Sequence, residues 1–287
     1  MFTKRMSLVY NPDRNHMYRE FFGLKEKPFN ITSDPNFLFL SRVHKEALSH
    51  LAYGIKERKG FLEITGEIGA GKTTLCRALL SRLDRKTKSA YIFNSTLPQL
   101  SLLQTILEDY GIAVTGRTKA SLLKQLNHFL IDELTRGGNV VLIIDEAQNL
   151  SASMLEEIRM LSNLETDKEK LFQIVLVGQP ELKNKLAAPG LKQLRQRIAV
   201  RFHITPLEKN ETADYINHRL AVAGSAGTIK FDPDAIENIY NYAGGIPRLI
   251  NMVCDKSLLT AYVMETREVT LPIVERSIRE MEGHYLS

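Results

Sequence analysis

The chain has 287 residues, of which 44% are apolar and 25% carry a charge; this composition excludes an intrinsically disordered protein and supplies enough aliphatic side chains for a core. Its two cysteines lie far apart, without a CxxC motif or a cysteine–histidine cluster, which excludes a cysteine metal site and indicates buried thiols in a reducing compartment. No apolar run approaches the roughly 20 residues of a membrane helix, and the first 15 residues lack the apolar stretch of a signal peptide. We therefore expect a cytoplasmic protein with no membrane span of its own.

The net charge of +5 is unevenly distributed. Residues 1–60 contain 11 Lys or Arg against 6 Asp or Glu, whereas residues 208–287 contain 8 against 12. A basic amino-terminal part and an acidic carboxyl-terminal part indicate a surface for nucleic acid or acidic lipid at one end of the chain, or head-to-tail association of subunits. An unevenly charged, solvated surface explains the pattern equally well.

Short apolar runs with β-branched residues alternate with segments of helical periodicity. In chain order these are strand 61–65, helix 73–83, strand 90–93, helices 100–110 and 119–134, strand 140–144, helix 153–164, strand 172–177, helix 181–186 and strand 200–204. This alternation predicts a parallel sheet with helices on both faces. We expect an α/β core over residues 45–207, preceded by a basic extension and linker over residues 1–44.

After Pro206 the strand pattern stops. Four segments with apolar spacings of three and four follow, at 210–223, 234–242, 248–264 and 272–281. Asp232 and Pro233 precede the second segment, and Thr270 is placed to cap the last one. Residues 208–287 therefore predict a small helical domain.

The strongest motif is the sequence G-x-x-x-x-G-K-T, which follows the first predicted strand and opens a helix. Glycines let backbone N–H groups turn toward phosphates, and the positive end of the next helix points at them. Lys72 is expected to reach the β- and γ-phosphates and Thr73 to ligate Mg²⁺. We therefore predict ATP and Mg²⁺ as cofactors. The expected nucleotide-binding residues are Gly66, Glu67, Ile68, Gly69, Ala70, Gly71, Lys72, Thr73 and Thr74.

Two carboxylates end the apolar strand 140–144. A buried strand cannot carry such charge without compensation, and magnesium supplies it. Asp145 is expected to hold the ion through water, and Glu146 to act as general base on the attacking water. Gln179 lies just beyond the end of the next predicted strand. It is expected to contact the γ-phosphate or the attacking water, or it is a turn residue before Pro180.

The order of phosphate loop, acidic strand end, polar strand tip, arginine-rich segment and helical domain resembles an AAA+ ATPase. The stretches FFGL (21–24), PF (28–29), DPNFLF (34–39), HKEAL (44–48), DEAQ (145–148) and GQPEL (178–182) are more narrowly similar to the ExeA (general secretion pathway protein A) family, over roughly residues 17–285. The resemblance implies an α/β fold of the P-loop NTPase (AAA+) type. This fold has a five-stranded parallel sheet with flanking helices and a small C-terminal helical lid domain.

The resemblance also implies residue roles. Gln179 takes the sensor-1 place, and Asn94 resembles the polar residue that restrains the catalytic glutamate until a partner binds. Arg248, in a sequence similar to the sensor-2 motif, is implied to reach the γ-phosphate from the lid. The alternative for Arg248 is a solvated residue, although a cation suits the start of a helix poorly.

An arginine finger is implied between residues 194 and 201, with Arg197 as first choice and Arg195 and Arg201 as alternatives. A finger acts on the nucleotide of the next subunit, so the resemblance implies a homo-oligomer, either a ring or a filament. The extension at 1–44 is expected to pack near the nucleotide. A basic cluster formed by Arg82, Arg85, Lys86 and Lys88 is a solvated face or a nucleic-acid contact.

Three functions are compatible with this predicted ATPase. The first is an ExeA-like ATPase that drives assembly or remodelling in a secretion or envelope system. Family members with this role commonly continue into a membrane span and a peptidoglycan-binding domain, so this chain would need a membrane or secretion partner. The second is a DNA-bound transposition helper ATPase of the TniB/TnsC type, which binds duplex DNA nonspecifically. The third is a nucleotide-dependent switch that recruits a partner.

Overall fold

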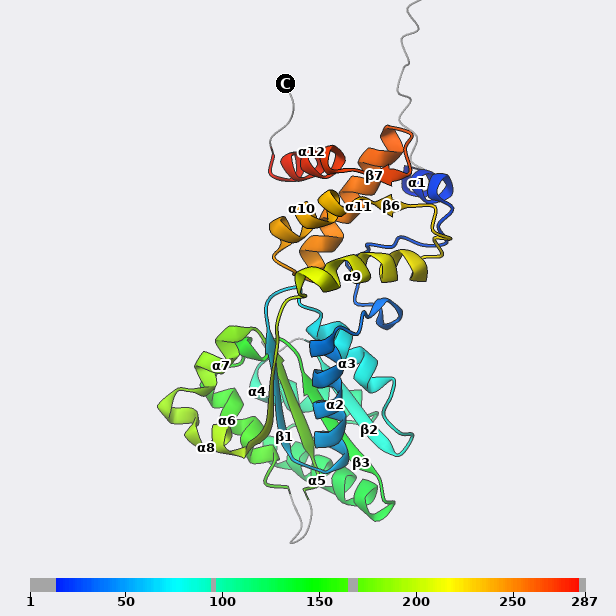
Figure 1. Ribbon diagram of the computed structural model, residues 1–287. Coiled ribbons are helices and arrows are strands. Elements are labelled where there is room, and N and C mark those ends of the chain that lie inside the picture. Colours follow the sequence, from blue (N-terminus) through cyan, green and yellow to red (C-terminus); the bar gives the residue numbers. More distant parts are fainter. Residues whose placement is uncertain (1–13, 94–96, 165–169, 284–287) are drawn as a thin grey trace, which may run out of the picture. The chain divides into compact units, whose positions relative to one another are not determined.

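The computed structural model describes residues 14–93, 97–164 and 170–283. The chain divides into two compact units (Figure 1). One unit comprises residues 33–206. The other comprises the described residues before 33 together with those from 207 onward.

The first unit is built on a five-stranded sheet whose paired strands are all parallel. Its strands are β1 (Phe61–Gly66), β2 (Thr87–Ile92), β3 (Asn139–Ile144), β4 (Gln173–Gly178) and β5 (Ile198–Ile204), in the spatial order β2-β3-β4-β1-β5. This sheet confirms the predicted fold class. The carboxyl ends of β1, β3 and β4 lie side by side, because β4 pairs with both of the others.

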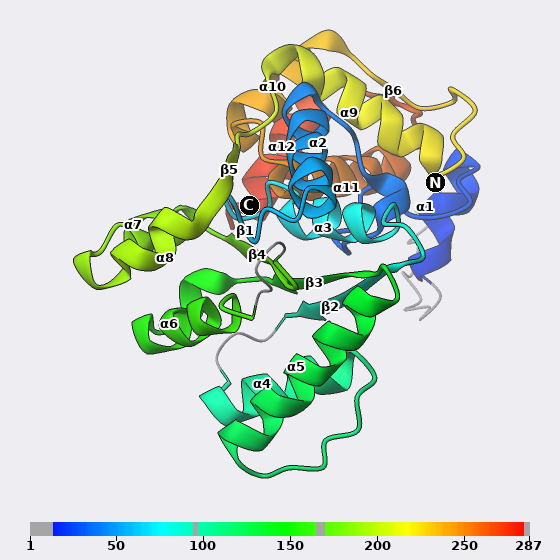
Figure 2. The same cartoon turned by 90° about the horizontal axis from the view of Figure 1, so that it is seen from below.

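Helices cover both faces of this sheet. They are α2 (Arg42–Lys56), α3 (Lys72–Leu80), α4 (Gln99–Asp109), α5 (Lys119–Thr135), α6 (Ala152–Leu161), α7 (Pro180–Leu186) and α8 (Lys192–Arg197), with short 3-10 turns η1 (Pro35–Phe37), η2 (Ala147–Asn149) and η3 (Pro189–Leu191). Figure 2 shows α2 and α3 on one side of the sheet and α4, α5 and α6 on the other. α2 and α8 lie outside the predicted elements.

The two faces follow from the alternation of side chains along each strand. In β3, Leu142 and Ile144 belong to a core cluster with α4, α5 and α6. Val141 and Ile143 belong to a second cluster with α2 and α3. Because both faces are buried, the strand is apolar from Val140 to Ile144, directly before Asp145.

The second unit is mainly helical. It contains α1 (Arg14–Phe22), α9 (Lys209–Val222), α10 (Pro233–Ala243), α11 (Pro247–Val263) and α12 (Leu271–Met281), with a short parallel pair formed by β6 (Lys230–Phe231) and β7 (Glu268–Val269). The four predicted helices after residue 207 correspond to α9 through α12.

The division of the chain differs at its amino-terminal end from the expected one, which grouped residues 1–44 as one extension. Here residues 14–32 belong to the helical unit, and residues 33–44 to the sheet unit. The buried Arg219 of α9 donates from Nε to the Pro28 carbonyl (2.5 Å) and from Nη2 to the Asn30 carbonyl (2.9 Å). These contacts join segments about 190 residues apart.

Within the described ranges, none of the helices is both long enough and apolar enough to cross a membrane.

Candidate functional site

The loop between β1 and α3 contains the predicted phosphate-binding residues. Gly71 precedes α3 with φ of 91°, a left-handed conformation that favours glycine. Lys72 is only 6% exposed, and its Nζ donates to the carbonyls of Gly66 (2.7 Å) and Glu67 (2.9 Å). Burial lowers the pKa of Lys72, and the charges of Glu146 and Asp145 oppose this shift.

His44 of α2 supports this loop from the adjacent helix. Its Nε2 lies 3.0 Å from the Ala70 carbonyl and its Nδ1 lies 2.7 Å from Ser41 Oγ. The carbonyl can only accept, so Nε2 carries the proton and Nδ1 accepts from the serine hydroxyl. The sequence offered His44 only as part of the family resemblance, because nothing local indicated a contact 26 residues away.

Asp145 lies directly after β3 and is fully buried. Its Oδ2 accepts hydrogen bonds from Thr73 Oγ1 (2.7 Å) and from the Tyr91 hydroxyl (2.5 Å), and its Oδ1 accepts from the Glu146 backbone N–H (2.9 Å). Burial raises the pKa of Tyr91, and the Asp145 charge raises it further, so the phenol stays protonated and donates. Sequence reasoning placed Tyr91 in a strand but missed this contact.

The paired oxygens of Thr73 and Asp145 fit a magnesium ion. Mg²⁺ prefers hard oxygen ligands and takes only one or two from the protein, the others coming from water and phosphate. A hydroxyl oxygen and a carboxylate oxygen 2.7 Å apart provide such a pair at the start of α3. The structure thus brings together the two residues that the sequence predicted as metal ligands.

Glu146 follows Asp145 with φ of 52°, in the left-handed region that non-glycine residues rarely adopt. Its Oε2 accepts from Gln148 Nε2 (2.5 Å) and from Gln179 Nε2 (3.3 Å). Gln179 follows β4 and is the residue before α7. The general base and the polar strand tip predicted from the sequence are therefore in contact.

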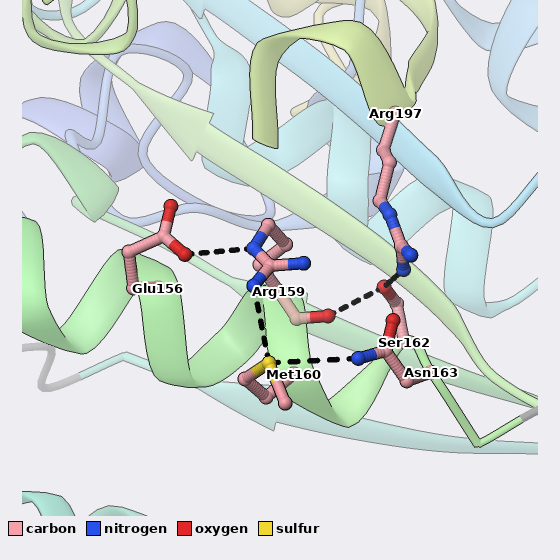
Figure 3. Close-up of polar contacts among 6 residues, drawn as sticks. All are labelled: Glu156, Arg159, Met160, Ser162, Asn163 and Arg197. Carbon is pink, nitrogen blue, oxygen red and sulfur yellow. Dashed lines mark hydrogen bonds and ion pairs between the residues drawn. The ribbon is translucent and has the colours of Figure 1, made fainter. Parts of the chain in front are cut away.

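The arginine-rich segment lies on α8 and β5. Arg197 is half-buried, and its Nη1 donates to Ser162 Oγ at the end of α6 (2.8 Å), while Ser162 Oγ donates to the Arg159 carbonyl (2.7 Å) (Figure 3). A guanidinium group at a helix carboxyl terminus interacts favourably with the helix dipole.

The two alternative arginines have different surroundings. Arg201 Nε pairs with Glu63 Oε2 (3.3 Å), a carboxylate buried in β1, and Arg201 also donates to the Arg195 carbonyl. Arg195 is exposed, and its side chain makes no hydrogen bond or ion pair with the residues that the structure describes. An arginine finger must reach the nucleotide of the neighbouring subunit. The ion pair of Arg201 with a buried acid of its own subunit opposes this, so Arg201 is the weakest of the three choices.

The roles of two further residues stay predictions. Arg248 is exposed in the first turn of α11 and belongs to the helical unit, so its lid role stays a prediction. Asn94 lies outside the described residues.

Residues 55–186 match a family model described as an AAA domain. The chain is 41% identical over 268 residues to general secretion pathway protein A of Aeromonas hydrophila. That match covers 93% of this chain and 49% of the relative, so the chain spans about half the length of that protein.

Solved structures of other proteins share the fold. Cdc6p of Pyrobaculum aerophilum has a TM-score of 0.66 at 17% identity, over 85% of this chain and 70% of that one. The ORC2 protein of Aeropyrum pernix, in ADPNP and ADP complexes, has a TM-score of 0.64 at 18% identity, over 86% of this chain and 72% of that one. Residues 55–186 of this chain therefore form an AAA domain in a protein with the P-loop fold, and 93% of the chain is similar in sequence to general secretion pathway protein A.

Proposed function

We propose that this protein binds ATP with Mg²⁺ and hydrolyses the nucleotide at the carboxyl edge of its sheet. The observation that carries this proposal is the direct contact of Thr73 with Asp145, with Glu146 as the next residue in the chain. The phosphate loop follows β1, and the proposed metal ligand Asp145 and general base Glu146 follow β3, on either side of β4. When bound, Mg²⁺ neutralises charge on the β- and γ-phosphate oxygens.

Lys72 supports an anionic ligand. Its ammonium is buried, and the structure gives it two neutral carbonyl acceptors from its own loop. A buried cation is stabilised more by an anion than by carbonyl groups, because the attraction between opposite charges is strong where water screens it little, whereas a carbonyl offers only a dipole. Polyphosphate therefore provides a better partner for Nζ than Gly66 or Glu67.

Glu146 and Gln179 supply the proton-transfer end of the site. A carboxylate beside the phosphate loop can accept a proton from the attacking water, and an amide next to it can orient that water. The contact between the two side chains supports a joint role. Arg248 and Asn94 are proposed to act with them, as the lid arginine and the restraining amide.

The test compares Glu146→Gln with the wild-type chain in ATP turnover and ATP affinity. The substitution keeps the shape of the side chain and removes the base, so affinity is expected to persist while hydrolysis falls to a small residual rate. Glu181→Gln, which changes an exposed acid in the first turn of α7, is the matched control. Continued hydrolysis by Glu146→Gln would show that another group acts as base.

We also propose that the active form is a homo-oligomer, a ring or a filament, in which Arg197 acts as a finger on the neighbouring subunit. An exchange of the Ser162 hydroxyl for a phosphate oxygen is favourable for a guanidinium group. A chain on its own would lack this group at its site.

For the work that hydrolysis drives, similarity to general secretion pathway protein A supports assembly or remodelling in a secretion or envelope system. This function is proposed to take place in the cytoplasm, where ATP is supplied, with a membrane or secretion protein as partner. Co-purification of a membrane protein with the ATP-bound Glu146→Gln variant would test it; a variant that elutes without such a partner would count against it.

A basic cavity favours a second candidate, a DNA-bound ATPase of the transposition-helper type. The cavity has a volume of about 510 Å³, and its charged lining residues are Lys56, Arg58, Arg82, Lys86 and Asp84. Related folds include the ORC1 protein of Aeropyrum pernix solved in complex with DNA. The excess of cations suits the phosphates of duplex DNA.

This candidate predicts that duplex DNA raises ATP turnover at low salt. The double variant Arg82→Glu, Lys86→Glu is expected to lose that response. Lys192→Glu, an exposed lysine elsewhere on the same unit, is the control and is expected to keep it. If DNA leaves the turnover of the wild-type chain unchanged at low salt, the second candidate is ruled out.

A further inference from the structure

We propose that Gln148 is the positioning residue of the general base, an inference that rests on the proposed ATPase function. Its amide bridges the ends of two neighbouring strands. Nε2 donates to Glu146 Oε2 at 2.5 Å, and Oε1 accepts from the backbone N–H of Gln179 at 3.0 Å. The carboxylate that follows β3 is thereby held at a defined place relative to the end of β4.

A primary amide is suited to this position because it donates and accepts at the same time. A carboxylate at 148 would repel the Glu146 charge, and an apolar side chain would leave the Gln179 N–H without its acceptor. Asparagine is one methylene shorter and does not span the same two partners. The two contacts therefore specify glutamine at this position.

Gly178, the last residue of β4, makes room for this amide. A Cβ atom built on Gly178 would lie 2.8 Å from Gln148 Oε1 and 2.9 Å from the Leu182 side chain. Side-chain carbons do not approach neighbours so closely. The absence of a side chain at 178 is thus a requirement of the bridge.

Lys185 of α7 holds the turn that carries Gln148. Its Nζ donates to the Gln148 carbonyl and to the Leu150 carbonyl, the latter at 2.8 Å. The turn η2 is therefore fixed to α7 through the Gln148 carbonyl, and to the end of β4 through the Gln148 side chain. Such support matters because Glu146 has a left-handed backbone, which is strained for a non-glycine residue and persists only where its surroundings enforce it.

The bridge acts on the reaction through orientation. Two amide donors hold the carboxylate through Oε2, and the orientation of this carboxylate decides which water molecule it can reach. Loss of the Gln148 donor lets the Glu146 side chain rotate away from the water. Small displacements of a catalytic group cost up to about 100-fold in rate.

The experiment uses Gln148→Met, which keeps the length of the side chain and removes both polar contacts. We expect kcat for ATP hydrolysis to fall about 10- to 100-fold, while KM and the dissociation constant of a fluorescent ATP analogue stay within about twofold. Asn149→Ala, at the exposed next position of the same turn, is the control and is expected to keep the wild-type kcat.

A double variant separates positioning from a general structural role. If Gln148 acts through Glu146, Gln148→Met should not lower the residual turnover of Glu146→Gln any further, because residues that act as a unit are not additive. A further drop of the same 10- to 100-fold would overturn the inference, as would a Gln148→Met variant with wild-type or raised kcat. Absence of hydrolysis by the wild-type chain would instead refute the proposed function, and this inference with it.

Discussion

Replacement of Arg197 by alanine separates the contribution of this side chain to folding stability from its contribution to ATP hydrolysis. In the chain itself, the substitution removes the bond from the guanidinium to Ser162 Oγ, 2.8 Å long, at the end of α6. A hydrogen bond from a charged donor contributes about 1.5–3 kcal/mol, and solvent screening of a half-buried arginine reduces this value. We expect the free energy of unfolding to fall by about 1–2 kcal/mol.

The effect on hydrolysis should be far larger. Arginine fingers change turnover by about 10³-fold or more, whereas a loss of 1–2 kcal/mol leaves most molecules of a protein with a typical stability of about 5–15 kcal/mol folded. Arg197→Ala is therefore expected to bind ATP, to remain folded and to lose turnover. Lys192→Ala, which removes an exposed cation from the same helix α8, is the matched control.

A mixing assay shows whether the arginine acts between subunits. Lys72→Ala chains have a defective loop and an intact finger, and Arg197→Ala chains have the reverse. In a 1:1 mixture that assembles at random, about a quarter of head-to-tail interfaces join an intact loop to an intact finger. Turnover should return to about that fraction of the wild-type value. Turnover of Arg197→Ala alone that is close to the wild type, or an inactive mixture, would refute the reasoning.

Two further predictions concern buried acids. Tyr91→Phe removes a hydrogen-bond donor to Asp145 Oδ2. Loss of a hydrogen bond to a metal ligand typically weakens metal binding at least tenfold, so the Mg²⁺ concentration for half-maximal turnover should rise about tenfold. An unchanged Mg²⁺ titration would count against a metal role for Asp145. Glu63→Gln should raise stability at neutral pH. Burial raises the pKa of Glu63 above its ordinary value of 4.5, despite the opposing Arg201 charge. The folded protein therefore favours the protonated carboxyl group. The contribution of Glu63 to stability is fully present below pH 4.5 and is lost as the pH rises through the folded pKa. Denaturant unfolding at several pH values should therefore show that the free energies of unfolding of the wild type and Glu63→Gln become equal as the pH falls toward 4.5. A difference between the two free energies that grows on acidification would contradict this assignment.

The sequence alone determined those parts of the protein whose physical cause is local. The phosphate loop is a run of eight residues between a strand and a helix, and its glycines and lysine follow from that short segment. The three central strands β1, β3 and β4 were predictable because both of their faces are buried, which makes each a largely apolar run. The edge strands β2 and β5 are only partly buried, and their apolar residues are interrupted by polar ones. Asp145 was predictable because a carboxylate interrupts such a run.

Only the tertiary structure decided which side chains support these residues. Tyr91 is 54 positions from Asp145, and Gln148 is 31 positions from Gln179. Before folding, both look like ordinary strand or turn residues, because a hydrogen bond between distant segments leaves no periodic pattern. The same holds for Arg219, whose bonds to residues near position 30 assign the amino-terminal segment to the helical unit. Local spacing specifies the elements and the loop, whereas the parallel strand order sets which side chains meet at the carboxyl edge of the sheet.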